Sequence, residues 1–453
     1  MARTTVADVL ADGLTRAGAG RIFAALTSDP VAIALREAAA RRGVPVHDAP
    51  EAATAGVLAA VSGEIGDGPG AVLADLRDAP ALVRGLAHAQ RDRAPLIAIT
   101  GGGSDVALLA PVVKGSLVVE PASAGHWIAH AANLASSAPR GPVHLAVDGV
   151  VVSESALPVA AACRPAPLPS PDPSALDALG AALARATRPI LITGLECGPD
   201  DAKWLRAFAE TLPAPVLATP KGRGVLADPH PLALGLLAAG HPLLARADLI
   251  LRVGVDPSEL PPGLLPTVTP VARIGRAAWA GGTLVADVPG DIALVIEEMA
   301  PRVRARSAAD WDVAELDRLK RALIQELRAT PAARLVALAR EAMPAGTIAT
   351  GDVPALAAWQ AVAPRETLTA LGMATAGYAV TAAVAAQLAH PDRRVVAFTS
   401  AVGLAAAEPA RAMAESQALP IIVVVLGSSG DERAFAAEFA RAFTTRRPSV
   451  LRC

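Results

Sequence analysis

The chain has 453 residues, which is enough for about three domains. Its formal charge of -2 and its pI near 6.5 leave no basic surface that would suit nucleic acid or anionic lipid. Hydrophobic residues make up 53% of the chain and aromatic residues only 3%, so Ala, Val and Leu must build the core. No charge-free apolar run is long enough to span a bilayer, and we expect no membrane partner.

The first residues and the cysteines predict a cytoplasmic protein. Residues 1–5 pass directly into an amphipathic helix pattern, without the apolar core or the cleavage site of a signal peptide. The three cysteines, Cys163, Cys197 and Cys453, are odd in number and far apart, which is typical of reduced thiols.

Strand-like apolar runs alternate with helical segments along the chain. The clearest runs are residues 95–101, 189–194 and 248–254, and each ends in a glycine, where the chain must turn sharply. Continuous apolar strands of this kind are buried on both faces of a sheet. The pattern predicts an α/β protein made of doubly wound parallel sheets.

Two segments indicate domain boundaries. Residues 164–171 are rich in Pro and Ala and have too few N–H donors for a helix or a sheet. The charged segment 302–328 carries apolar residues at helical spacing, which predicts a helix that bridges two domains. We therefore predict three domains at 1–162, 175–303 and 330–453, with linkers at 163–174 and 304–329.

The third block contains strand 391–396, a turn, a helix and the apolar run 421–426. It resembles the diphosphate half of the acetolactate synthase and 2-oxo acid decarboxylase family, whose enzymes use thiamine diphosphate (ThDP). By this resemblance the family's Gly-Asp-Gly turn falls on Ser400–Ala401–Val402, and its Asn-Asn pair falls on Gly427–Ser428. Mg²⁺ needs hard oxygen ligands, and Ala401 and Gly427 have no side-chain oxygen.

The resemblance extends over the other two blocks. Residues 6–14 and 139–148 are similar to the family's pyrimidine domain, and residues 214–224 are similar to its central domain. The third domain is expected to be shortened, because residues 434–443 already resemble the family's last helix and 447–452 its last strand. The family's cofactor lies between subunits, so the resemblance also implies a homodimer or tetramer and a small 2-oxo acid as ligand.

Glu51 is the strongest candidate for a catalytic residue. In the family, a glutamate of the pyrimidine domain protonates the aminopyrimidine nitrogen of ThDP, and the resemblance places it at Glu51. The alternative is a residue in the first turn of a helix beside Pro50, where a carboxylate gains roughly 0.3–1 kcal/mol from the helix dipole.

Other positions that would touch ThDP differ from the family. Its glycine-rich loop is replaced by Asp75–Ala81, and the methionine that supports the bent cofactor is replaced by Ala376. Bulky and charged side chains therefore stand where the family has glycine.

Charged residues near Glu51 suggest a second kind of site. Ligands bind at strand ends in α/β folds, so these residues could form a new acid–base site. The alternative is that they are solvated loop charges. The group consists of His47, Asp48, Glu51, Asp75, Arg77 and Asp78.

Three further motifs are weaker. Gly101–Gly103 could bind phosphate at a helix start or form a flexible loop. His126 and His130 have helical spacing but no third ligand, so we predict no metal site. Gly194, Lys221, Gly222 and Gly254 could border FAD or ADP, but they form no nucleotide fingerprint and we expect neither ligand.

Three functions remain open. The leading hypothesis is an acetolactate synthase-like protein that has lost standard Mg-ThDP binding, as a pseudo-enzyme or with a repurposed pocket and with no cofactor. The first alternative is an active ThDP-dependent lyase or carboligase on a 2-oxo acid, with Glu51 as activator and Ser400 or Ser428 as atypical metal ligands. The second alternative is cofactor-free hydrolase or lyase chemistry by the carboxylates near Glu51.

Overall fold

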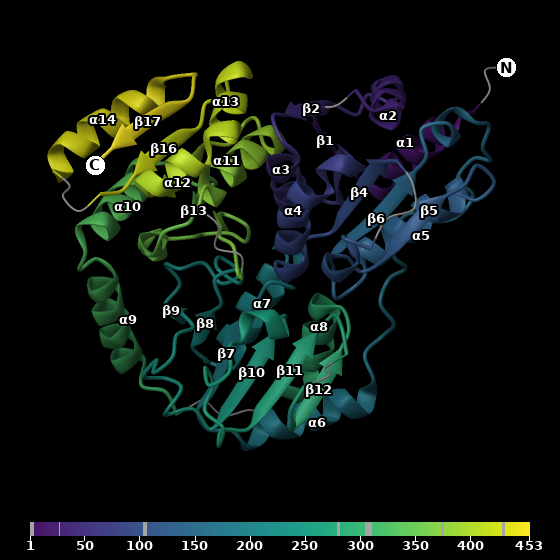
Figure 1. Cartoon of the computed structure of the whole chain (residues 1–453). Helices are drawn as coiled ribbons and strands as arrows, with labels where there is room; N and C mark the ends of the chain where they lie inside the picture. Colours follow the sequence, from purple (N-terminus) through teal and green to yellow (C-terminus); the bar gives the residue numbers. More distant parts are fainter. Residues whose placement is uncertain are drawn as a thin grey trace. The chain divides into compact units, whose positions relative to one another are not determined.

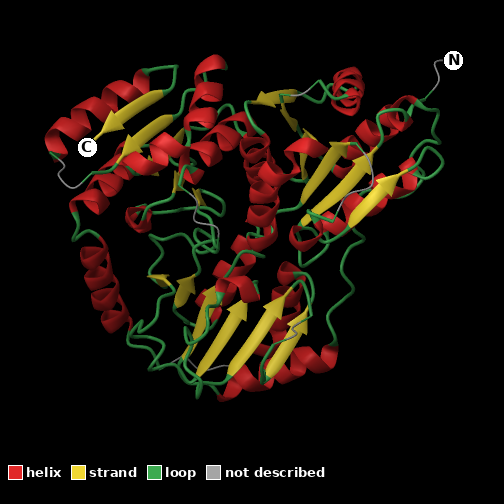
Figure 2. Cartoon of the chain, viewed as in Figure 1, coloured by secondary structure: helices red, strands yellow, loops and turns green. Residues whose placement is uncertain are grey.

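The computed structural model describes residues 4–26, 28–102, 107–278, 281–303, 310–372, 376–427 and 431–453, without the side chain of Leu76. Helices and strands alternate along the chain, and the strands form three sheets with helices beside them (Figures 1 and 2). The α/β prediction is confirmed. None of the described helices combines the length and the apolar character that a bilayer crossing needs.

The first sheet has six parallel strands in the order β2-β1-β3-β4-β6-β5. The chain adds β2 on one side of β1 and then crosses to β3 on the other side, and ligands bind at such switch points in α/β sheets. The strands are β1 (Ile22–Ala25), β2 (Val46–Ala49), β3 (Gly70–Asp75), β4 (Leu96–Gly101), β5 (Ser116–Val119) and β6 (Pro142–Val147). The helices of this part are α1 (Val6–Ala17), α2 (Pro30–Arg41), α3 (Ala52–Ile65), α4 (Ala79–Arg91) and α5 (Ala124–Ser136).

Helix α3 is buried along nearly its whole length, and small residues make this possible. Gly56 faces Gly85 of α4 so closely that a Cβ atom on Gly85 would lie 2.5 Å from the Cα atom of Gly56. At the other end of α3, a Cβ atom on Gly63 would overlap the carbonyl oxygen of Pro95. The Ala- and Gly-rich composition therefore sets how closely α3 approaches its neighbours.

The second sheet also has six parallel strands, in the order β12-β11-β10-β7-β8-β9. The predicted runs 189–194 and 248–254 form two of its central strands, β7 and β10. The strands are β7 (Pro189–Thr193), β8 (Val216–Ala218), β9 (Ala233–Leu236), β10 (Leu249–Val253), β11 (Val271–Gly275) and β12 (Ala286–Pro289). The helices are α6 (Pro173–Arg185), α7 (Pro199–Thr211) and α8 (Ile292–Val303).

The third sheet has five strands in the order β14-β13-β15-β16-β17. The predicted last helix and last strand are confirmed as α14 and β17. The strands are β13 (Ile348–Gly351), β14 (Thr367–Leu368), β15 (Val395–Thr399), β16 (Ile422–Val425) and β17 (Ser449–Arg452). The helices are α9 (Val313–Leu327), which precedes the sheet, α10 (Pro331–Ala342), α11 (Tyr378–Ala389), α12 (Ala401–Ala406), α13 (Glu408–Ser416) and α14 (Glu432–Thr444).

By its internal contacts the chain forms two compact units. One unit contains residues 1–166, 372–425 and 444–450, and the other contains residues 167–371, 426–443 and 451–453. Each unit has its own buried apolar core. The three-domain division with its boundaries stays a prediction.

Candidate functional site

Glu51 lies between β2 and α3, at the carboxyl end of β2. Its backbone is extended, with φ of -149° and ψ of 157°, and it is the N-cap residue of α3. Its side chain is exposed and does not cap the helix; its Oε1 atom instead accepts a hydrogen bond from Thr54 Oγ1 at 3.0 Å. Glu51 therefore lies one residue before the first turn of α3, whereas the alternative interpretation placed it within that turn. Its carboxylate faces solvent at the end of β2.

Asp75 and Arg77 neutralise each other at the end of β3. The Asp75 carboxylate accepts hydrogen bonds from Arg77 N at 3.0 Å, Nε at 2.8 Å and Nη2 at 2.5 Å. These bonds to Arg77 hold the pKa of Asp75 below its ordinary value. Asp75 is consequently a poor general base, and these contacts give the cofactor-free alternative no support.

The rest of the predicted charged group is also dispersed. Asp48 pairs with Arg36, and His47 Nδ1 lies 3.2 Å from Oε1 of Gln417, the residue that follows α13. Asp78 precedes α4 without capping it. Among the described residues, no hydrogen bond or ion pair joins Glu51 to any other member of the group. That these residues form one acid–base site stays a prediction, and no described hydrogen bond or ion pair between Glu51 and the others supports it.

The positions of the family's metal-binding turn lie at the carboxyl end of β15. Ser400 caps α12, because its Oγ atom accepts a hydrogen bond from Gly403 N at 3.1 Å. Ala401 follows with an exposed methyl group. Thr399 is fully buried, and its Oγ1 atom has no hydrogen-bond partner among the described residues. This turn therefore offers two hydroxyl groups and no carboxylate.

Gly427, the first position of the Asn-Asn pair, packs against the backbone of Cys453. Its N–H donates to the Cys453 carbonyl oxygen at 2.7 Å, and a Cβ atom on Gly427 would lie 2.5 Å from that oxygen. A side chain such as Asn would need the two segments to move apart. Ser428 lies outside the described residues.

Ala376 lies beside α4. Its carbonyl oxygen accepts a hydrogen bond from Arg84 Nη2 at 3.1 Å, and its methyl group is exposed. Nearby, a Cβ atom on Gly372 would lie 2.5 Å from Arg91 Nε. The segment around Ala376 thus contacts the arginine side chains of α4, and no described hydrogen bond or ion pair connects it to Glu51.

These residues fit the two ends of ThDP differently. The exposed Glu51 carboxylate suits the pyrimidine end, where a carboxylate must hold a proton at a ring nitrogen. The described residues at the diphosphate end do not fit a Mg²⁺ ion held by protein side chains, because they supply neutral hydroxyl groups only. The described side chains at this end therefore assign no chemical role to a metal ion.

The structure adds no further ligands to the candidate metal motif at His126 and His130 or to the candidate phosphate motif at Gly101–Gly103 among the described residues. His126 and His130 lie on α5 with exposed, stacked rings whose centroids are 6.2 Å apart. Within the described ranges, no three His, Cys, Asp or Glu residues are grouped so that they could hold a metal ion. Of the Gly101–Gly103 motif, Gly103 lies outside the described residues, and Gly102 N donates to Val147 O at 3.1 Å.

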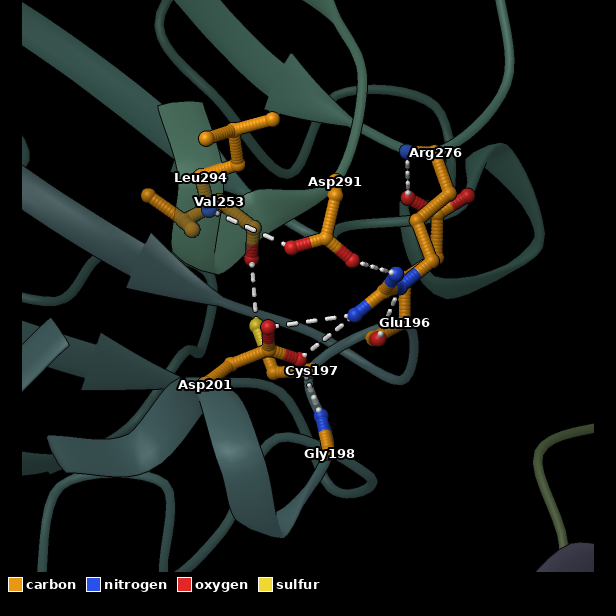
Figure 3. A network of polar contacts seen from close by, with 8 residues as sticks. All are labelled: Glu196, Cys197, Gly198, Asp201, Val253, Arg276, Asp291 and Leu294. Carbon is orange, nitrogen blue, oxygen red and sulfur yellow. Dashed lines mark hydrogen bonds and ion pairs between the residues drawn. The ribbon is translucent and has the colours of Figure 1, made fainter. Parts of the chain in front are cut away.

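A network of charged residues that the sequence did not predict lies at the carboxyl edge of the second sheet (Figure 3). The Arg276 guanidinium pairs with Asp201 at 2.9 Å and with Asp291 at 2.6 Å. Arg276 N also donates to Glu196 Oε2 at 2.8 Å.

Burial raises the pKa of the neighbouring Cys197 thiol, which is therefore not a ready nucleophile.

Glu259 is a second buried charge at this edge. It accepts hydrogen bonds from Thr219 Oγ1 at 2.5 Å, Leu195 N at 3.0 Å and Asp256 N at 3.1 Å. Burial raises the pKa of Glu259 to about 7, although these hydrogen bonds act in the opposite direction. A Cβ atom on Gly194 would lie 2.5 Å from Glu259 Oε2, so this predicted nucleotide-site glycine packs against a protein carboxylate.

Comparison with protein families gives three matches along the chain. The N-terminal TPP binding domain of thiamine pyrophosphate enzymes matches residues 4–107, their central domain matches residues 176–298, and their C-terminal TPP binding domain matches residues 349–430.

Two relatives and two solved structures agree with these matches. The acetolactate synthase large subunit of Parasynechococcus marenigrum is 29% identical over 93% of this chain and 76% of its own length. The Escherichia coli acetolactate synthase isozyme 1 large subunit is 28% identical over 70% of this chain and 63% of its own length. Benzoylformate decarboxylase from Polynucleobacter necessarius has the same fold, with a TM-score of 0.80 at 18% identity over 99% of this chain and 98% of its own. A proposed thiamin diphosphate-dependent enzyme from Mycobacterium smegmatis also gives a TM-score of 0.80, at 19% identity over 100% and 99% of the two chains.

These matches correct the expectation that the chain uses no cofactor. Both TPP binding domains and the acetolactate synthase relatives point to ThDP, with Mg²⁺, as the cofactor. That expectation was wrong because the loss of side chains at one end of a cofactor does not imply the loss of the whole cofactor. The chain belongs to the thiamine diphosphate-dependent enzyme family and is acetolactate synthase-like.

Proposed function

We propose that this protein is a ThDP-dependent lyase or carboligase that acts on a 2-oxo acid. Its similarity to acetolactate synthases over 93% of the chain supports the reaction class. The fold that it shares with benzoylformate decarboxylase is compatible with a 2-oxo acid substrate, since benzoylformate is one.

The observation that carries the proposal is the position of the Glu51 carboxylate. It is exposed at the carboxyl end of β2, and the resemblance in sequence assigns the family's activating glutamate to this position. A carboxylate placed there can hold a proton at the aminopyrimidine nitrogen of ThDP. When bound, ThDP itself supplies the carbon nucleophile that adds to the 2-oxo group.

The diphosphate end then has an atypical set of contacts. No side-chain carboxylate is available at Ala401 or Gly427, so a Mg²⁺ ion would keep water and phosphate oxygens as its main ligands. The hydroxyl groups of Thr399 and Ser400 are the side-chain oxygens that the described part of this turn offers. We therefore expect the affinity for ThDP to depend less on Mg²⁺ than it would if a side-chain carboxylate held the metal ion.

We also propose that the protein is a cytoplasmic homodimer or tetramer. Glu51 shares no described hydrogen bond or ion pair with Ala376 or Ser400. A second copy of the chain would let Glu51 of one subunit face the diphosphate turn of another, as in the family.

Calorimetric titration with ThDP and Mg²⁺ tests the proposal. We expect saturable binding by the wild-type protein and weaker binding by Glu51→Gln. Glu37→Gln is the matched control, because Glu37 is also an exposed carboxylate of the same compact unit but lies within α2. Absence of ThDP binding by the folded protein, or equal binding by both variants, would overturn the proposal.

A further inference from the structure

Helix α4 carries two arginines that lie against the backbone shortly before α11. The Arg84 Nη2 atom donates to the Ala376 carbonyl oxygen at 3.1 Å. A Cβ atom on Gly372 would lie 2.5 Å from Arg91 Nε and 2.9 Å from Arg91 Nη2, so this guanidinium group packs closely on the glycine. All four residues belong to the same compact unit.

The two arginines lie on the same face of α4. They are nearly two helical turns apart, which places their Cα atoms roughly 10 Å from each other. Arg91 is exposed and Arg84 is half-buried. A ligand that lies between them on the helix surface can therefore contact both guanidinium groups.

Neither arginine has a carboxylate partner among the described residues. Arg84 has one described hydrogen bond, to a neutral carbonyl oxygen, although a guanidinium group has five N–H donors. Its Nε atom is buried and has no hydrogen-bond partner in the described part of the chain. Asp92, the carboxylate next to Arg91 in the sequence, is buried and lies 3.8 Å from His88 Nδ1. The described residues therefore leave two positive charges uncompensated here.

These two charges favour an anion with more than one charged group. A buried N–H donor without an acceptor is unfavourable, and an anion at Arg84 would offset this cost. Arginine suits phosphate oxygens because its planar fork can donate two parallel hydrogen bonds. A monocarboxylate would match one guanidinium group only. A diphosphate has terminal oxygen atoms on two phosphorus atoms, so one molecule can engage both arginines.

We propose that Arg84 and Arg91 bind a diphosphate group. The group belongs either to ThDP or to a separate molecule, and its chemistry at the arginines is the same in both cases. The inference does not rest on the proposed function, because binding of free diphosphate can be measured without ThDP and without a substrate. If ThDP is the source, the two arginines supply charge compensation that Ala401 and Gly427 cannot provide through Mg²⁺.

Calorimetric titration of the full-length protein with inorganic diphosphate tests the site. EDTA is present, so that no magnesium complex forms. We expect saturable binding by the wild type and about tenfold weaker binding by Arg84→Gln and by Arg91→Gln, since each variant loses a charge-assisted hydrogen bond. Succinate, a dianion without phosphate oxygens, should bind at least about tenfold more weakly than diphosphate.

Arg185→Gln is the matched control. Arg185 is an exposed arginine in the last turn of α6, has no described partner either, and belongs to the other compact unit. We expect this variant to bind diphosphate as the wild type does. Because Arg91 is exposed and no described hydrogen bond depends on it, Arg91→Gln remains informative if Arg84→Gln fails to fold.

Parallel titrations with ThDP and with thiamine identify the source of the diphosphate. If the two variants of α4 weaken the binding of ThDP but not of thiamine, the site takes the diphosphate of the cofactor. If they weaken the binding of free diphosphate only, the site takes a separate molecule. A wild-type protein that binds diphosphate but not ThDP would keep this inference and overturn the proposed function.

Three results would overturn the inference. They are no saturable binding of diphosphate by the wild-type protein, equal affinities for diphosphate and succinate, or an affinity of Arg91→Gln for diphosphate that matches that of Arg185→Gln.

Discussion

Arg276 Nη2 lies 2.9 Å from Asp201 Oδ2, and the Asp201 side chain is only 1% exposed. The pair joins the end of β11 to the first turn of α7. Asp201 also accepts a hydrogen bond from Gly198 N at 2.7 Å, so the same carboxylate caps α7. One side chain therefore fixes both a helix start and a strand end at the edge of the second sheet.

Replacing Asp201 by Ala should destabilise the protein by about 2–4 kcal/mol, because it removes a helix cap and one partner of a largely buried ion pair. Chemical denaturation followed by circular dichroism measures the change. Asp177→Ala is the control, since Asp177 pairs with Arg302 at a 71% exposed position and should cost less than about 1 kcal/mol. Equal effects of the two variants would contradict the role of burial.

The pH dependence of stability should report Glu259. Its pKa is raised from 4.5 to about 7 in the folded state, so the folded protein holds this proton more tightly than the unfolded chain does. The stabilising contribution is complete below pH 4.5 and is lost as the pH rises through 7. We expect the free energy of unfolding to fall more between pH 5 and 7.5 in the wild type than in Glu259→Gln, by about 2–3 kcal/mol. Parallel pH profiles would show that Glu259 titrates normally.

Glu51→Gln should lower the turnover of a 2-oxo acid substrate by about 10²–10⁴-fold, the usual range for loss of a general acid–base group. Its thermal midpoint should stay close to that of the wild type, because the side chain is exposed and does not cap α3. A panel of 2-oxo acids assayed for decarboxylation and for carbon–carbon bond formation gives the measurement. Full activity of Glu51→Gln would assign the proton transfer to another residue.

Removal of metal should weaken ThDP binding by less than about tenfold, since Ala401 and Gly427 offer no side-chain oxygen to Mg²⁺. Titration of ThDP with EDTA and with excess Mg²⁺ provides the comparison. Ala401→Asp supplies the missing carboxylate at the end of β15, and we expect it to increase the dependence of ThDP binding on Mg²⁺. A hundredfold loss on chelation in the wild type would show that other oxygen ligands hold the metal.

Much of the fold could be predicted from the sequence. The runs 95–101, 189–194 and 248–254 correspond to β4, β7 and β10, because strands buried on both faces are continuously apolar. The last helix and strand were also predictable, from their resemblance to the family's final elements.

The charged networks could not be predicted in this way. Asp201 and Arg276 are 75 residues apart, and neither belongs to a recognisable motif. Likewise, Glu259 meets Thr219 and Leu195 only after β7, β8 and β10 align in the sheet. Such contacts depend on register between distant strands, which a local pattern does not contain. The position of Glu51 came from resemblance to a family, and the structure adds that its carboxylate is exposed at a strand end.

The close approach of Gly56 and Gly85 bears on how this protein could be altered. Random mutagenesis should find almost no tolerated replacement at either position, whereas the exposed residues around Glu51 have room for many side chains. Helix α3 would then hold the Glu51 carboxylate in place while the exposed residues around Glu51 are replaced. Substrate range could therefore be engineered by libraries at the strand ends, with the packing of α3 left untouched.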